Sequence, residues 1–209
     1  MQAYILKQTQ GEFHTDVAEM LFNIAKYEMK AGRLNDTLPK LLESLMITRL
    51  NFGNYHSSAL NTMYQIGKLH ELQGDTSEAL TIYQEILSAY STSDFSGDKW
   101  FIVVLFHRVA ELSYLLEKQE EAIQAYLEVF NIISSDLGCN HYSLVSVLQI
   151  LCGLYAELGM TNKGAEAYEL SKNITYSQED SNDPELEAII VSLFGVACIN
   201  NFSIASAAA

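Results

Sequence analysis

The stretch HSSALNTMYQIGKLHELQG, residues 56–74, is followed almost at once by TSEALTIYQEILSAY, residues 76–90, and these two segments decide the fold. In the first segment, apolar or small residues recur at spacings near three and four, as on one face of an α-helix: Leu60, Met63, Ile66, Gly67 and Leu72. The second segment repeats that spacing, with an inner face of Ala79, Ile82, Tyr83 and Ile86. Gly74 between them suits a left-handed helix end. The sequence therefore predicts a pair of helices joined by a tight turn.

The same pair recurs along the chain with a period of 42 or 43 residues. One glycine column contains Gly11, Gly53 and Gly138, with Gly97 one place off, and a histidine follows three residues later at His14, His56 and His141. A second column contains Gly32, Gly74 and Gly159, with Glu117 in the third repeat. Two further columns are Thr37, Ala79, Ala122, Gly164 and Leu41, Tyr83, Tyr126, Tyr168. Four columns with one period identify an internal repeat.

The repeat predicts an all-α solenoid of about four helix pairs. Its first helices are expected at 14–31, 56–73, 99–116 and 141–158, and its second helices at 35–51, 76–91, 119–136 and 161–176. Small residues in both helices of a pair allow a close crossing. The tyrosines then fill the space between neighbouring pairs, so we interpret them as core residues rather than as a cofactor site.

The whole predicted solenoid covers residues 1–200. It consists of a half repeat (1–11), complete repeats at 12–53, 54–96, 97–138 and 139–180, and a terminal helix at 184–200, before an unstructured tail at 201–209. A solenoid end exposes apolar surface unless it is capped. These unfinished ends have two possible explanations. In the first, the chain is a piece of a longer repeat protein or packs its ends on neighbouring proteins. In the second, it is a natural short protein with imperfect caps.

Composition excludes several classes of function. The net charge of −14 disfavours binding to nucleic acid or to anionic membranes. No uninterrupted apolar run is long enough to insert into a membrane. The three cysteines form no C-x-x-C pair and their number is odd, which fits a reducing, cytoplasmic location.

No motif for catalysis, metal binding or cofactor binding is present. The chain lacks G-x-S-x-G, a glycine-rich phosphate loop and H-E-x-x-H. Three of the five histidines stand about one repeat apart, so a structural role at helix starts is expected in place of a shared metal. We therefore predict a protein that is not an enzyme and has no cofactor.

These columns resemble the tetratricopeptide repeat, with a small residue in the first helix and an alanine and an aromatic residue in the second. The 42-residue period and the Gly-x-x-His joints are similar to the kinesin light chain and nephrocystin subgroup. Departures at Glu117, Thr37 and Lys99 put helix-end geometry in doubt, but not the architecture. The resemblance implies a right-handed superhelix whose first helices line a concave groove that accepts peptides or partner helices.

The resemblance also implies which side chains face that groove. They are Phe22, Asn23 and Lys26 in the first repeat, Tyr64, Gln65 and Lys68 in the second, and His107 and Arg108 in the third. Cations and aromatic rings in such a ladder could take an acidic or aromatic peptide segment. The alternative is an ordinary solvated helix surface.

Two functions follow from the sequence. The first is a non-catalytic scaffold that binds a peptide or partner protein in the groove. The second is a structural subunit of a larger multiprotein complex, held through the solenoid ends and the convex face.

Overall fold

The computed structural model describes residues 7, 11–92 and 99–174 of the chain. The chain divides into two compact units, residues 1–97 and 98–209, and each unit is described by itself. Every regular element in 11–92 and 99–174 is an α-helix, as the repeat predicts.

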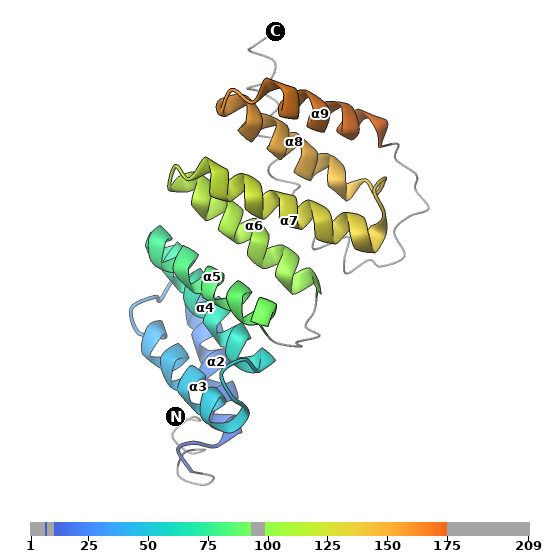
Figure 1. Ribbon diagram of the computed structural model, residues 1–209. Helices are drawn as coiled ribbons and strands as arrows, with labels where there is room; N and C mark the ends of the chain where they lie inside the picture. Colours follow the sequence, from blue (N-terminus) through green and yellow to red (C-terminus); the bar gives the residue numbers. More distant parts are fainter. Residues whose placement is uncertain (1–6, 8–10, 93–98, 175–209) are drawn as a thin grey trace. The chain divides into compact units, whose positions relative to one another are not determined.

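The first unit contains two complete helix pairs. Helices α2 (Thr15–Lys30) and α3 (Thr37–Phe52) form one pair, and α4 (Ser57–Gln73) and α5 (Thr76–Thr92) form the other. α3 packs on α4, so the second helix of one pair meets the first helix of the next (Figure 1). α2 also contacts α4, which brings the two first helices together.

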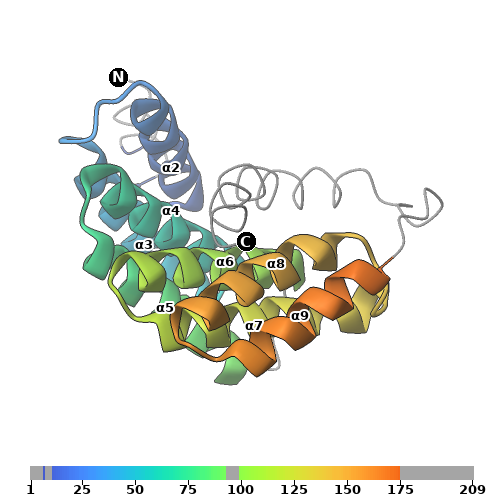
Figure 2. The same cartoon turned by 90° about the horizontal axis from the view of Figure 1, so that it is seen from above.

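The second unit repeats this arrangement. It pairs α6 (Lys99–Leu115) with α7 (Gln119–Leu137), and α8 (Ser143–Glu157) with α9 (Thr161–Asn173). α7 packs on α8 (Figure 2). All eight helices begin and end within three residues of the predicted bounds. The predicted terminal helix at 184–200, the tail at 201–209 and most of the half repeat at 1–11 lie outside the described residues.

Histidines stand at the starts of three helices, as the sequence indicated, and two of them, His14 and His56, are the N-cap residues. The Nδ1 atom of His14 accepts a hydrogen bond from the backbone N–H of Asp16, and His56 Nδ1 does the same for Ser58, each at 3.2 Å. His141 Nδ1 accepts from the backbone N–H of Ser143 at 3.4 Å. Each imidazole therefore satisfies an amide that the first turn of a helix leaves without a partner.

The second glycine column ends the first helices through backbone geometry. Gly74 adopts a left-handed conformation with φ of 87°, which glycine reaches without steric cost. Glu117 stands in the same column and adopts φ of 60°, the one positive φ of a non-glycine residue within the described ranges. The helix therefore ends in the same left-handed conformation at this position even where the residue is Glu, which disfavours a positive φ.

The small residues and the tyrosines meet as expected. A Cβ atom built on Gly67 would lie 2.5 Å from the Tyr83 ring, so only glycine allows α4 and α5 to pack as they do here. Tyr83 and Tyr126 are buried as predicted, but Tyr168 is 49% exposed, so the prediction that it is a core residue was wrong. The prediction for Leu72 was also wrong: Leu72 is 52% exposed, and Leu69 takes the buried place, because a helical turn after Ile66 brings residue 69 back to the core face.

Candidate functional site

The predicted groove residues of the first unit form three columns on two adjacent helices. Adding 42 to a position on α2 gives its counterpart on α4: Phe22 with Tyr64, Asn23 with Gln65, and Lys26 with Lys68. The columns therefore offer an aromatic ring, an amide and a cation, each present twice. α2 contacts α4, so the two copies of each column lie on neighbouring helices.

The three columns differ in exposure. Asn23, Lys26 and Lys68 are exposed, and Gln65 is half-buried. The aromatic column is half-buried because it also packs within each unit. The Tyr64 ring lies 5.6 Å from the Tyr83 ring, and the Lys26 ammonium lies 5.3 Å from the Phe22 ring centroid. The amides and cations are thus the polar groups that a ligand would meet first.

The two lysines are available for binding. In the part of the chain that the structure describes, neither Lys26 nor Lys68 lies within ion-pair distance of a carboxylate. Three other cations of the first unit are paired, Lys7 with Glu43, Lys40 with Glu28 at 3.0 Å and Arg49 with Glu85 at 3.7 Å, whereas Lys30 and Arg33 have no ion pair among the described residues. An acidic ligand would therefore meet two unneutralised positive charges about one repeat apart.

His107 differs from the expectation of a solvent-facing groove residue. Its side chain is 2% exposed and lies edge-on to Tyr126, with ring centroids 5.8 Å apart. His107 occupies the same repeat position as Phe22 and Tyr64. The side chains at this position point toward the second helix of their own pair. The shorter imidazole follows the same direction and is buried where the larger rings are only half-buried.

Arg108 is engaged by a carboxylate on its own helix. Its Nη1 donates to Glu111 Oε2 at 2.8 Å, and His107 Nε2 lies 3.5 Å from Glu111 Oε1. Burial raises the pKa of Glu111, but the hydrogen bonds and charges of His107 and Arg108 outweigh burial, so the pKa lies below its ordinary value. Glu111 occupies the column of Lys26 and Lys68, so the cation column does not continue into the third repeat.

The neighbourhood of Glu111 also affects Tyr126. Burial, with the negative charge of Glu111 adding to it, raises the pKa of the Tyr126 hydroxyl well above its ordinary value. The residues His107, Arg108, Glu111 and Tyr126 therefore form a compact polar cluster between α6 and α7. This cluster joins α6 to α7 and engages the Arg108 guanidinium with Glu111 on its own helix.

The described residues show few features of a metal-binding or catalytic site. Within residues 11–92 and 99–174, no three His, Cys, Asp or Glu side chains gather in a way that could hold a metal ion. The helices that the structure describes include none with the length and apolar character needed to span a membrane. A shallow hollow of about 360 Å³ lies at the start of α2, lined by Phe13, His14 and Asn51 among others. It has no constellation that would activate a nucleophile or a water molecule.

Comparisons with known proteins agree with the repeat. A family model described as "Tetratricopeptide repeat" matches residues 16–92, which include most of α2 and all of α3 to α5. No curated protein sequence matches the chain.

Solved structures show the same fold. A candidate kinesin light chain from Podosopora anserina with nearly identical TPR-like repeats is 14% identical, with 90% of each chain covered and a TM-score of 0.62. BtubC (BKLC) from P. vanneervenii is 16% identical, with 99% of this chain and 86% of that one covered, also at 0.62. A tetratricopeptide repeat protein from Parabacteroides merdae is 18% identical, with 85% and 60% covered and a TM-score of 0.56. At these identities the likeness is one of fold.

Proposed function

We propose that the chain binds a peptide on its first helices, because residues 16–92 match the tetratricopeptide repeat, the fold resembles that of kinesin light chain-like repeat structures, and such repeats serve as protein–protein interaction scaffolds. The binding surface is the set of paired columns on α2 and α4. The ligand is an extended segment that carries carboxylates and an aromatic side chain. No catalytic step is part of this function.

One observation carries the proposal: Lys26 and Lys68 repeat in register, are exposed, and have no carboxylate partner among the residues described. Most other surface cations in the first unit are neutralised by a neighbour, as Lys40 is by Glu28. Lysine–carboxylate pairs at a binding surface are charge-assisted hydrogen bonds, which are stronger than neutral ones. Asn23 and Gln65 beside them can bind the backbone of an extended peptide.

The Phe22 and Tyr64 rings give the surface an apolar part. Both rings are half-buried and fixed by packing, Tyr64 against Tyr83 and Phe22 under the Lys26 ammonium. A ring held in place loses little rotational freedom when a ligand side chain packs on it. Aromatic anchors of this kind dominate the energy of many interfaces. An aromatic residue in the ligand therefore adds affinity to the ionic contacts.

The test compares two charge reversals of equal size. Lys26→Glu with Lys68→Glu changes the proposed surface, and Arg33→Glu with Lys163→Glu changes two exposed cations that are not part of it. Fluorescence anisotropy is measured with labelled peptides that are acidic and aromatic, acidic only, or basic. We expect the acidic aromatic peptide to bind the native chain best. The first variant should lose at least about tenfold in affinity, since two ion pairs become repulsive.

The control variant should bind as the native chain does. Equal loss in both variants would mean that net charge alone attracts the peptide, and the proposed surface would be wrong. Equal binding of acidic and basic peptides would contradict the ligand class. Circular dichroism of each variant checks that the helices are intact.

A structural role in a larger complex is the second candidate. It is favoured by apolar side chains that the second helices leave exposed, such as Met46 on α3 and Tyr168 on α9. Removal of these side chains would release the chain from such a complex without affecting peptide binding. Size-exclusion chromatography of native extract, with the chain detected by antibody, separates the two roles.

A further inference from the structure

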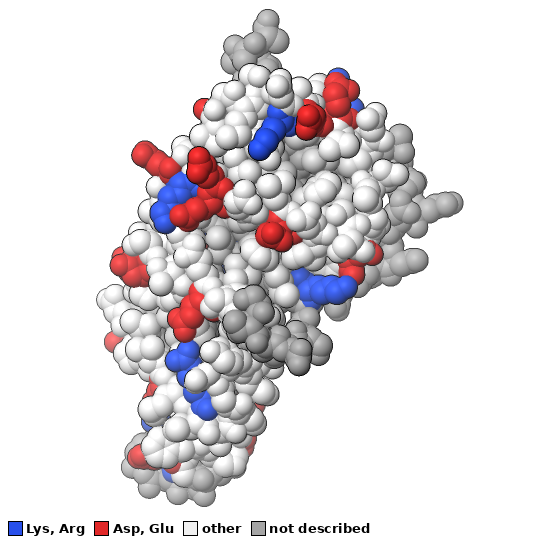
Figure 3. All heavy atoms as spheres, in the orientation of Figure 1, with Lys and Arg blue, Asp and Glu red and all other residues white. Residues whose placement is uncertain are grey.

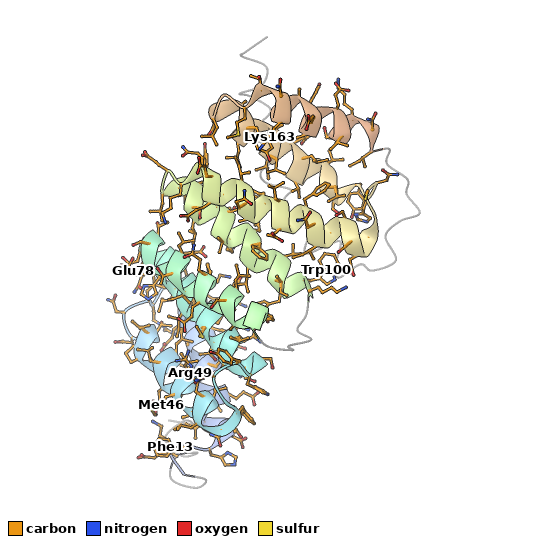
Figure 4. The ribbon with its side chains drawn as sticks, in the orientation of Figure 1. Phe13, Met46, Arg49, Glu78, Trp100 and Lys163 are labelled. Atoms are coloured by element: carbon orange, nitrogen blue, oxygen red, sulfur yellow. The ribbon has the colours of Figure 1, made fainter. Side chains whose placement is uncertain are left out.

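An apolar stripe runs along the outer face of α3. Its members are Leu42, Met46 and Leu50, whose side chains are 50%, 47% and 68% exposed. Their spacing of four residues places them in one row on the helix surface. Figure 4 labels Met46 in the middle of this row, with Arg49 beside it and Phe13 in the segment before α2.

The internal repeat supplies a control for this stripe. At the same positions α5 carries Gln84, Ser88 and Thr92, and α9 carries Glu169 and Asn173 in the two places that the structure describes. α7 carries Asn131 and Ser135, with the half-buried Leu127 as its one apolar member. The outer face of a second helix in this fold therefore has no need of apolar residues. The repeat pattern therefore does not account for the stripe on α3, and a contiguous exposed apolar row is a feature of interaction surfaces.

The charges around the stripe point to its occupant. α5 and α7 carry acids and no bases, whereas α3 carries Lys40 and Arg49 against Glu43. Each of these three is paired inside the unit: Lys40 with Glu28, Arg49 with Glu85, and Glu43 with Lys7. Acidic side chains gather over the start of α7 in Figure 3 but are sparse over α3.

Two copies of a chain with a net charge of −14 repel each other over most of their surface. Among the second helices that the structure describes, α3 is the one with more bases than acids, and it also carries the apolar row. We propose that the stripe of Leu42, Met46 and Leu50 is a self-association surface, on which the α3 helix of a second copy of this chain packs.

Helix geometry supports a symmetric contact. The three residues form a single ridge of i±4 spacing, and two such ridges interdigitate when helices cross at an angle near −50°. In a twofold dimer the same patch meets itself, so both partners supply a ridge of the right type. Met46 is the central member and lies near the twofold axis. Its flexible side chain adapts to a copy of itself.

The small exposed area of the stripe limits the affinity of the proposed dimer. Three half-exposed side chains amount to at most a few hundred Å², below the roughly 800 Å² per partner of a stable interface. Phe13, whose backbone oxygen accepts from the Asn51 side chain near the end of α3, adds a further exposed ring. We expect a weak dimer with a dissociation constant of about 1–100 μM.

Sedimentation equilibrium of the full chain over about 1–500 μM, which brackets that range, tests the proposal. The native chain should shift from monomer to dimer. The variant Leu42→Gln, Met46→Ser, Leu50→Thr copies the residues of α5, so its helix should form as α5 does. This variant should remain a monomer throughout. The control Gln124→Ser, Asn131→Ser, Ser135→Thr on the outer face of α7 should dimerise as the native chain does.

A monomer at every concentration of the native chain would overturn the proposal and leave the stripe to a helix of another protein. An unchanged dissociation constant in the α3 variant would overturn it as well. Single variants guard against a folding defect: Met46→Glu should weaken the dimer at least tenfold, and Met46→Leu should not. A photocrosslinker at position 46, in a mixture of ¹⁴N- and ¹⁵N-labelled chains, should join α3 to α3 between chains. Crosslinks that map only to other helices would contradict the assigned surface.

Discussion

At the scale of single residues, the histidine caps are an unusual feature of these helices. Ser, Thr, Asp and Asn are the ordinary residues at this position because a short oxygen-bearing side chain reaches the free amides. Here the imidazole Nδ1 of His14 and His56 takes that role. His56 also stacks on Phe52, with ring centroids 4.6 Å apart. The histidine thus joins two helices, since it caps α4 and packs on the end of α3.

Substitution of His56 separates these two contributions. His56→Ala should lower the free energy of unfolding by about 1 kcal/mol, as loss of a cap does, and lower Tm by about 2–4 °C in a chain of this size. His56→Asn retains an acceptor for the Ser58 amide and should recover most of that loss. Thermal unfolding followed by circular dichroism measures both. If the Asn variant is as unstable as the Ala variant, stacking on Phe52 outweighs the cap.

Glu111 makes stability depend on pH. Its pKa is lower in the folded chain than in the unfolded chain, because His107 and Arg108 stabilise the carboxylate despite its burial. Its contribution to stability is therefore present above the unfolded pKa of about 4.3 and is lost as pH falls below it. We expect the difference in unfolding free energy between the native chain and Glu111→Gln to shrink between pH 6 and pH 3. Urea titrations at each pH measure it, and a difference that stays constant would contradict the assignment.

At the scale of the helix pair, α4 and α5 pack closely because Gly67 has no side chain. Gly67→Ala would place a Cβ 2.5 Å from the ring of Tyr83, a fully buried residue whose hydroxyl donates to Glu71. Gly153 in α8 is a matched control, since a Cβ there meets nothing within 4 Å. Gly153→Ala should stabilise the chain by about 0.5–1 kcal/mol through helix propensity alone.

Gly67→Ala should instead destabilise the chain, by up to about 2 kcal/mol after the gain in helix propensity is subtracted from the cost of overpacking. Adding Tyr83→Leu reproduces the Ala25 and Leu41 combination of the first pair and should recover part of the loss. Chemical denaturation of the three variants and the native chain provides the comparison. A stabilising Gly67→Ala would show that the ring moves aside freely.

The elements themselves could be predicted from the sequence because each helix pair is a local structure. Spacing, glycine columns and histidine joints all fall within about 40 residues, and no distant contact is needed to read them. The sequence could not predict how deeply the side chains at each repeat position are buried. Phe22, Tyr64 and His107 share a column, yet only His107 is buried. That difference depends on side-chain length and on the partner in the next helix, which period alone does not encode.

The candidate site shows the same limit. The sequence predicted one ladder from Phe22 to Arg108. The structure retains the cation column at Lys26 and Lys68 and shows Arg108 paired with Glu111. The sequence shows that Arg108 and Glu111 are three residues apart, a spacing at which two side chains on a helix can pair. The 2.8 Å contact in the structure shows that this pair competes with ligand binding. The apolar stripe on α3 was visible in the sequence too, and it stands out only once exposure is compared between repeats.

At the scale of the whole molecule, the net charge of −14 opposes the folded state. The chain carries 26 acids and 12 bases, and its isoelectric point is near 4.6. Self-repulsion destabilises the folded state, and salt screens it: the Debye length falls from about 30 Å at 0.01 M to about 3 Å at 1 M.

We expect Tm at pH 7.5 to rise when sodium chloride is increased from low to high concentration, and to change little near the isoelectric point. Differential scanning calorimetry at low protein concentration measures this without interference from self-association. A Tm that falls with salt at pH 7.5 would show that ion pairs such as Lys40 with Glu28 outweigh the repulsion.

The histidine caps are also intrinsic spectroscopic reporters at the joints between helix pairs. A neutral ring whose Nδ1 accepts an amide proton carries its own proton on Nε2, so the caps made by His14 and His56 favour that tautomer. Imidazole ¹⁵N and ¹³C shifts distinguish that tautomer from the mixture present in an unfolded chain. His14, His56 and His141 stand at the starts of three different helix pairs. Three resonances would therefore follow the unfolding of three pairs separately, in the native chain and without any label attached to it.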